Sequence, residues 1–227
     1  MLLADMTYAR RSSLLKRLKP AVLTVGDVLY EAHTPIRHIY FPVDCLVSLL
    51  APSQGHLSVE VGVVGSEGIV GVPLALGMRT SLVQATVQGA GSALCMSAQA
   101  FRDELPRQPA LRRDINRYIH SLMAQLTQTA ACNAFHTVEA RCARWLLTAR
   151  DRMQSDELEL TQELLAQMLG VRRVGVTLAA GNLQRNGAIS YSRGRVLILD
   201  PLRLAEAACE CYRVVRNAYK RAEAGTG

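Results

Sequence analysis

The sequence contains no apolar run close to the roughly 20 residues that a helix needs to cross a bilayer. Charged residues interrupt positions 1–19, so the apolar segment of a secretory signal is missing there as well. These absences argue against a membrane protein and an exported protein. We therefore expect a cytoplasmic location.

Closely spaced cysteine motifs are absent too. None of the six cysteines forms a CxxC pair, and Cys209 and Cys211 are two residues apart, a spacing at which helical side chains do not share a face. The five histidines include no HxH pair. We therefore expect no metal site and interpret these residues as small core or surface side chains in a reducing compartment, with a haem-ligating histidine left open. They are Cys45, Cys95, Cys132, Cys142, Cys209 and Cys211, and His33, His38, His56, His120 and His136.

Acidic residues are missing from one long stretch. None lies between Glu163 and Asp200, although that stretch contains five arginines and the whole chain has a formal net charge of +7. Uncompensated arginines favour a polyanionic partner, because contacts with phosphates release counterions. A solvated basic face without a ligand is the alternative.

The remaining composition, with 49% hydrophobic and 20% charged residues over 227 positions, is typical of a soluble globular protein with one large or two small domains. Turn residues divide positions 20–98 into short segments rich in β-forming residues, which predicts a sandwich or a small barrel. A short amphipathic helix is expected over 8–18. The expected strands are 22–25, 28–30, 39–41, 45–50, 57–61, 84–87 and 93–96.

Helical patterns follow the β-rich part. Ser97 is suited to cap a short helix, and residues 110–134 contain neither Gly nor Pro. Within that range one apolar stripe recurs at intervals of three and four: Ile115, Ile119, Leu122 and Leu126. A helix of 25 residues is about 37 Å long, which favours a paired, dimerising helix. Burial of the stripe against the β-rich domain is the alternative.

The most informative segment follows a helix expected over 137–153. Thr161 is a suitable N-cap for a helix over 162–169, and Gly170 is suited to end it in the left-handed conformation. A second helix is expected over 173–186, with Gly187 as its end. Two short helices joined at a glycine indicate a helix-turn-helix. The predicted buried side of the second helix consists of Val176, Leu178, Ala179 and Leu183.

A β-hairpin, or wing, is expected over 188–199, with its turn at Arg193 and Gly194. In a winged helix the second helix enters the major groove, while the first helix and the wing contact phosphates. At the start of the second helix an arginine can bind guanine bidentately, and Val174 can contact a thymine methyl group. A structural hairpin with incidental arginines is the alternative. The expected DNA-binding residues are Thr161, Gln162, Arg172, Arg173, Val174, Thr177, Arg185, Arg193 and Arg195.

The segments LTQELLAQMLGVRR at 160–173 and LQRNGAI at 183–189 resemble the Crp/Fnr family of transcription regulators, as do residues 26–31 and 40–42. The resemblance covers nearly the whole chain and implies an α+β protein. Its expected parts are a jelly-roll (double-stranded β-helix) sensor domain over 1–105, a dimerisation helix over 106–136, and a winged helix-turn-helix with a C-terminal helical extension over 137–227. The implied function is sequence-specific DNA binding as a homodimer on a two-fold symmetric site, with RNA polymerase as a further partner and no membrane.

The sensor domain departs from the family members that bind cyclic nucleotides. Their phosphate cassette has a Gly-Glu pair and a later Arg-Ser or Arg-Thr pair, whereas here Gly71 precedes Val72. We therefore predict no cofactor and no cyclic nucleotide bound in the usual way. The later pair is represented at the expected spacing by Val83 and Gln84, although Arg79 and Thr80 resemble it; these six residues are the effector-pocket candidates.

The recognition helix departs from the family as well, because many members have Arg-Glu where this chain has Arg173-Val174. The preferred bases are therefore expected to differ.

Two other functions remain open. In the first, the protein binds DNA constitutively and the β-domain serves only as a scaffold. In the second, the protein is a metal-dependent enzyme whose β-domain gathers metal ligands from His38, His56, Glu60 and Glu67. The expectation from the winged helix is a regulator and not an enzyme.

Overall fold

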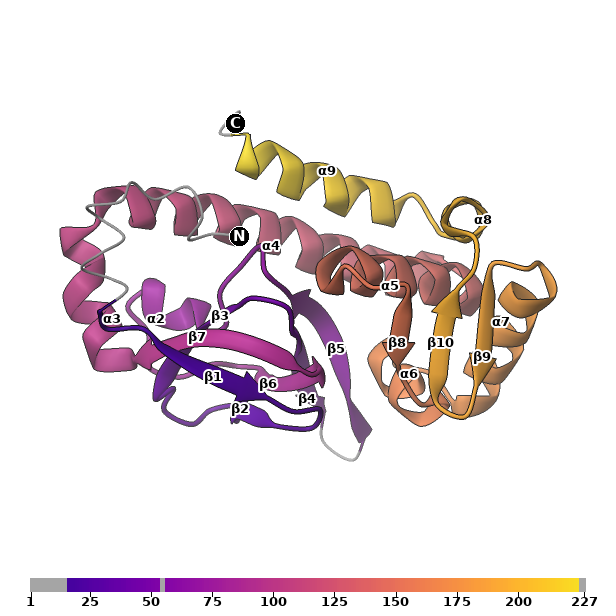
Figure 1. The fold of residues 1–227 in the computed structure, drawn as a ribbon, viewed down its shortest axis with the longest axis horizontal. Coiled ribbons are helices and arrows are strands. Elements are labelled where there is room, and N and C mark those ends of the chain that lie inside the picture. Colours follow the sequence, from indigo (N-terminus) through magenta and orange to yellow (C-terminus); the bar gives the residue numbers. More distant parts are fainter. Residues whose placement is uncertain (1–15, 54–55, 225–227) are drawn as a thin grey trace.

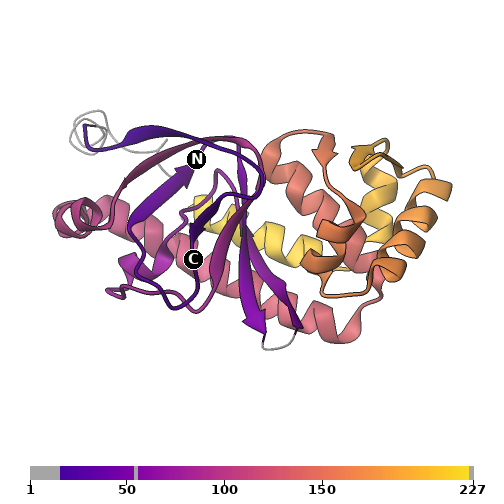
Figure 2. The ribbon, with the colours of Figure 1, turned by 90° about the horizontal axis from the view of Figure 1, so that it is seen from below.

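The computed structural model describes residues 16–53 and 56–224, and it has an α+β fold (Figure 1). A β-domain and a smaller helical domain lie side by side on one long helix, α4 (Pro109–Phe135), which passes along both of them (Figures 1 and 2). The helix expected over 8–18 falls almost entirely outside the described residues. No helix in the described ranges is long and apolar enough to cross a membrane.

The β-domain consists of two antiparallel sheets that face one core. One has the order β1-β7-β3 and the other β2-β6-β4-β5. Ile39 and Phe41 from the first sheet and Val47 and Val87 from the second are buried in the shared core. The strands are β1 (Lys19–Leu23), β2 (Val28–Tyr30), β3 (His38–Pro42), β4 (Leu46–Ser53), β5 (His56–Val64), β6 (Gln84–Gly89) and β7 (Gly91–Ser97).

Strand β4 is buried on both faces. Val47 and Leu49 point into the β-domain core, whereas Leu46 and Leu50, on the alternate positions, belong to the core of the helical domain. The two domains therefore pack against opposite faces of this one strand. Because both faces are buried, its sequence is an apolar run without alternation of polar and apolar residues.

Helix α2 (Val72–Ala75) lies between β5 and β6, whereas α3 (Ala98–Glu104) and the 3-10 turn η1 (Leu105–Arg107) connect the β-domain to α4. As expected, Ser97 caps α3, its Oγ accepting the Ala100 N–H at 3.2 Å. The stripe assigned to a dimer interface is buried differently from that expectation. Ile115 and Leu122 lie in the β-domain core, and Ile119 and Leu126 pack partly buried against it. Pairing with a second chain and burial against the β-domain predict the same apolar spacing. In the structure, this face is buried against the β-domain.

The C-terminal helix α9 (Cys211–Glu223) covers a second face of α4 (Figure 1). The Ser121 hydroxyl donates to the Ala218 carbonyl at 3.2 Å, and the Tyr219 hydroxyl donates to the Gln125 side chain at 3.1 Å. Within the described residues, the β-domain and α9 thus leave a third face of α4 exposed, where Met123 lies.

The helical domain contains α5 (Val138–Met153), α6 (Gln162–Leu169), α7 (Arg173–Arg185) and α8 (Pro201–Ala207), with a sheet of order β8-β10-β9. Strands β9 (Ile189–Ser192) and β10 (Arg195–Ile198) form the expected wing. Strand β8 (Glu157–Glu159) was not expected, because three residues that pair only with a distant strand carry no local signal.

Candidate nucleic-acid interface

The turn between α6 and α7 is built by the residues that the sequence indicated. The Thr161 hydroxyl accepts the Leu164 N–H at 3.2 Å and so caps α6, and Gly170 ends it with φ +61°. Gly170 is required for a second reason, because a Cβ there would lie 2.8 Å from Val59 Cγ2 on β5. The helix-turn-helix is therefore packed tightly against the β-domain.

The outer face of α7 is exposed along its length. Val174 is 70% and Leu178 65% exposed, and Arg173 and Thr177 are exposed beside them. Placing Leu178 on the buried side was wrong. It lies about 200° around the helix from Val176, whose face it was assigned to. Two exposed apolar side chains one turn apart are suited to contact thymine methyl groups.

A side-chain contact joins the two helices at this face. Thr177 Oγ1 lies 2.8 Å from Gln162 Oε1 on α6, to which it donates, and 3.1 Å from the Arg173 carbonyl of its own helix. Gln162 is thereby held beside the first turn of α7. Both side chains were expected to contact DNA, and the structure brings them together.

The arginines expected to bind DNA fall into two groups. Among the described residues, no acidic side chain forms an ion pair with Arg172, Arg173 or Arg193, and all three are exposed. Arg185 donates to Asn182 on its own helix, and Arg195 lies 3.7 Å from acceptor oxygens of both glutamates of β8. The first group carries the uncompensated charge of this surface.

The wing projects Arg193 at its turn. Arg193 and Gly194 both have positive φ, +49° and +78°, the conformation of tight two-residue hairpins. The Gly194 carbonyl accepts the Leu160 N–H at 2.7 Å, and the Tyr191 hydroxyl donates to the Leu160 carbonyl, also at 2.7 Å. The wing is thus held against the start of α6.

The effector-pocket candidates lie elsewhere, on the β-domain. Gly71 precedes α2 with φ +113°, and Val72 is partly buried against the core. The Gln84 side chain donates to Glu31 Oε2 at 2.6 Å. The other candidates, in the segment between α2 and β6, are Arg79, Thr80 and Val83. A cavity of about 380 Å³ lies apart from them, between α5, α9 and Glu67.

The carboxylates considered for a metal-dependent enzyme have structural partners. Glu60 is fully buried and accepts from the Ser48 hydroxyl at 2.5 Å and from Trp145 Nε1 at 2.8 Å. Glu67 forms an ion pair with Arg152 at 2.9 Å. His38 is exposed, and the His56 side chain lies outside the described part of the structure.

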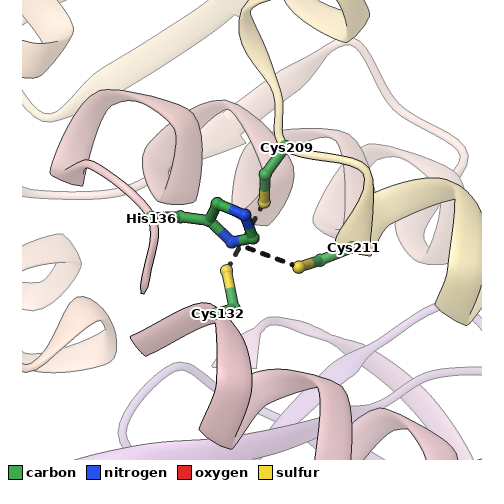
Figure 3. A group of neighbouring side chains, drawn as sticks. All are labelled: Cys132, His136, Cys209 and Cys211. Carbon is green, nitrogen blue, oxygen red and sulfur yellow. Dashed lines mark hydrogen bonds between the residues drawn. The ribbon is translucent and has the colours of Figure 1, made fainter. Parts of the chain in front are cut away.

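Nothing in the sequence indicated that four of the cysteine and histidine side chains lie together. The ligand atoms of Cys132, His136, Cys209 and Cys211 all lie within 4.8 Å of one another (Figure 3). The i, i+4 spacing of Cys132 and His136 was a local signal for a shared helix face. Their meeting with Cys209 and Cys211, more than 70 positions later, needed the tertiary structure.

These features define a winged-helix DNA-binding protein. Residues 140–207 match the family model of the Crp-like helix-turn-helix domain. The chain is 25% identical over 207 residues to the CRP-like cAMP-activated global transcriptional regulator of Mycobacterium tuberculosis, covering 87% of this chain and 91% of that one. The chain therefore contains a Crp-like helix-turn-helix domain and is similar to a CRP-like transcriptional regulator over most of its length, and it is a DNA-binding transcription regulator.

Solved structures have the same fold. A CRP/FNR-family transcriptional regulator from Thermus thermophilus is 24% identical with a TM-score of 0.67, covering 84% of this chain and 98% of that chain. FixK2 from Bradyrhizobium japonicum is 12% identical with a TM-score of 0.71, covering 85% of this chain and 98% of that chain.

Proposed function

We propose that the protein regulates transcription as a homodimer that inserts α7 of each subunit into successive major grooves of a two-fold symmetric DNA site. The observation that carries this is the exposed face of α7, which presents Arg173, Val174, Thr177 and Leu178. Beside it, Arg172 and Arg193 are, like Arg173, without an acidic partner among the described residues. Arg173 reads a base, Arg172 and Arg193 contact phosphates, and Arg185 and Arg195 contribute less because each already has a partner. Gln162, held by Thr177, contacts the backbone beside the reading helix, and Thr161 supports it by capping α6.

The dimer seam that we propose is the face of α4 left free by the β-domain and α9. Met123 and Ala130 are exposed on it, and Ile119 and Leu126, which are partly buried against the β-domain, border it. The four residues recur at intervals of four, three and four, the spacing of a two-stranded coil. This replaces the seam through Ile115 and Leu122, which are buried in the β-domain.

We further propose that no cyclic nucleotide controls this protein in the manner of the family's nucleotide-binding members. Val72 stands where those members have a carboxylate, and Gln84 is hydrogen-bonded to Glu31. The Mycobacterium tuberculosis relative is cAMP-activated by its name, so titration of the purified protein with cAMP in a calorimeter is the direct test. Micromolar binding that also changes DNA affinity would contradict this part of the proposal.

RNA polymerase as a partner, and the cytoplasm as the location, follow from a role at promoters.

Selection of DNA from a random pool by the purified protein tests the main proposal. We expect an inverted repeat whose half-sites are centred about 10 base pairs apart, or a multiple of that, because one helical turn separates successive grooves. Affinity for the selected site should fall steeply with added salt. Enrichment of no sequence, with binding independent of salt, would refute it.

A further inference from the structure

We propose that Cys132, His136, Cys209 and Cys211 bind one zinc ion at the junction between α4 and the DNA-binding domain. Cys132 is in the last turn of α4, and His136 directly follows that helix. Cys209 and Cys211 flank the start of α9. Figure 3 shows the four side chains converging from these two segments.

The distances fit a single tetrahedral ion. Cys132 Sγ and Cys209 Sγ are 3.4 Å apart, as are Cys211 Sγ and His136 Nδ1. With Zn–S bonds of about 2.3 Å and Zn–N bonds of about 2.0 Å, a regular tetrahedron has edges of about 3.5–3.8 Å between its ligand atoms. These two distances are within about 0.4 Å of the tetrahedral edges, and no pair of the four ligand atoms is more than 4.8 Å apart. Three cysteines with one histidine are a common donor set of structural zinc.

The surrounding groups orient the ligands as the outer shell of a metal site does. His136 turns Nδ1 toward the thiols, and its Nε2 lies 3.2 Å from Glu210 Oε1. A carboxylate on the far nitrogen of a ligating histidine fixes the ring and its tautomer. The Gln128 amide donates to Cys211 Sγ at 3.1 Å, a contact that also stabilises a thiolate.

The charge of the neighbourhood suits the bound form. Three thiolates and one Zn²⁺ have a net charge of −1, and all three cysteines are buried. The buried guanidinium groups of Arg141 and Arg144 act electrostatically on this cluster. The Nε atom of each is buried without a hydrogen-bond partner among the described residues. A negative centre beside them offsets the cost of burying two cations.

The position of the site gives it a structural consequence. His136 is one of the two extended residues between α4 and α5, at the elbow about which the DNA-binding domain would turn. Zinc would tie this elbow to the first turn of α9 and so fix the angle between the long helix and the reading helix. Loss of zinc, or oxidation of the thiols, would free the elbow.

The alternative to a zinc site is a disulfide between Cys132 and Cys209, and the experiment distinguishes the disulfide from the zinc site. The full chain is purified without oxygen in the presence of a thiol-free reductant, and its metals are measured by mass spectrometry. We expect about one zinc per chain, as for a structural site. Replacement of zinc by Co²⁺ should give the visible bands of tetrahedral cobalt and a sulfur-to-cobalt charge-transfer band.

The variants Cys209→Ser and His136→Gln should each lower the zinc content at least tenfold, whereas the control Cys95→Ser, on β7 of the other domain, should keep it. The cobalt spectrum of the unchanged chain tests the proposal even where a variant fails to fold. The zinc site is refuted by a metal-free chain that gives no tetrahedral cobalt spectrum, by an iron–sulfur spectrum, or by a Cys132–Cys209 disulfide that forms with zinc in excess. DNA affinity is measured separately, so a metal-free chain that still binds its DNA site would refute the zinc site alone.

Discussion

The carboxylate of Glu60 on β5 accepts a hydrogen bond from the indole Nε1 of Trp145 on α5 at 2.8 Å, and this bond joins the sensor-like domain to the DNA-binding domain. Its other oxygen accepts from Ser48, and Arg144 and Arg152 supply positive charge nearby. Burial outweighs these favourable contacts and raises the pKa of Glu60 to about 7. The domain interface therefore contains a group that titrates close to neutral pH.

Stability should depend on pH through Glu60. Between about pH 4.5 and 7 the folded chain keeps a proton that the unfolded chain has lost, so the free energy of unfolding falls as the pH rises through this range. Glu60→Gln should remove this dependence, worth on the order of 3 kcal/mol over that range. Urea unfolding at several pH values measures it, with Glu206→Gln on the exposed surface as the control. Equal pH dependence in both variants would contradict the assignment.

Arg173→Ala should weaken binding to the selected DNA site by about 1–3 kcal/mol and relax the preference at one base pair, because the bidentate contact to guanine is lost. Fluorescence anisotropy on the selected site and on single-base variants measures both effects. Arg107→Ala, an exposed arginine in η1 just before α4, is the control for net charge. A uniform loss across all sequences would reassign Arg173 to the DNA backbone.

Arg193→Ala, at the tip of the wing, should behave differently. We expect weaker binding to all sequences alike. The slope of the logarithm of the binding constant against the logarithm of the salt concentration should be smaller by about one, since one phosphate contact is removed. Anisotropy titrations over a range of salt concentrations give the slope. An unchanged slope would mean that the wing does not reach a phosphate.

Met123→Glu should convert the dimer to a monomer and abolish high-affinity DNA binding, because it places a charge at the centre of the free face of α4. Sedimentation velocity gives the molecular mass in solution. Ala205→Glu adds the same charge at an exposed position of α8 and should leave the dimer intact. A dimeric Met123→Glu protein would require a different seam.

Gly170→Ala should lower the free energy of unfolding by at least about 1 kcal/mol, because alanine is strained at φ +61° and its Cβ would meet Val59 at 2.8 Å. The matched change Gly181→Ala, inside α7 with open space around its Cβ, should instead stabilise the chain by up to about 1 kcal/mol. Thermal unfolding without DNA compares the two. A neutral Gly170→Ala would show that the turn and β5 can separate easily.

Local features of the structure were predictable because local rules govern them. The caps at Ser97 and Thr161, the helix end at Gly170 and the hairpin turn at Arg193 each depend on residues within four positions of one another. The same holds for the wing, whose two strands are adjacent in the chain. The free face of α4 was harder to identify, since intervals of three and four recur on more than one side of a long helix.

The sequence by itself therefore determined the division into a β-rich part, a long helix and a winged helix-turn-helix, and the unpaired arginines at the start of α7, because periodicity, capping and uncompensated charge are properties of neighbouring residues. Only the tertiary structure decided that Ile115 and Leu122 are buried within the chain, that Glu60 meets Trp145, and that Cys132 and His136 meet Cys209 and Cys211. Such contacts depend on how whole elements pack, and no pattern of neighbouring residues specifies which distant segment arrives at a given face.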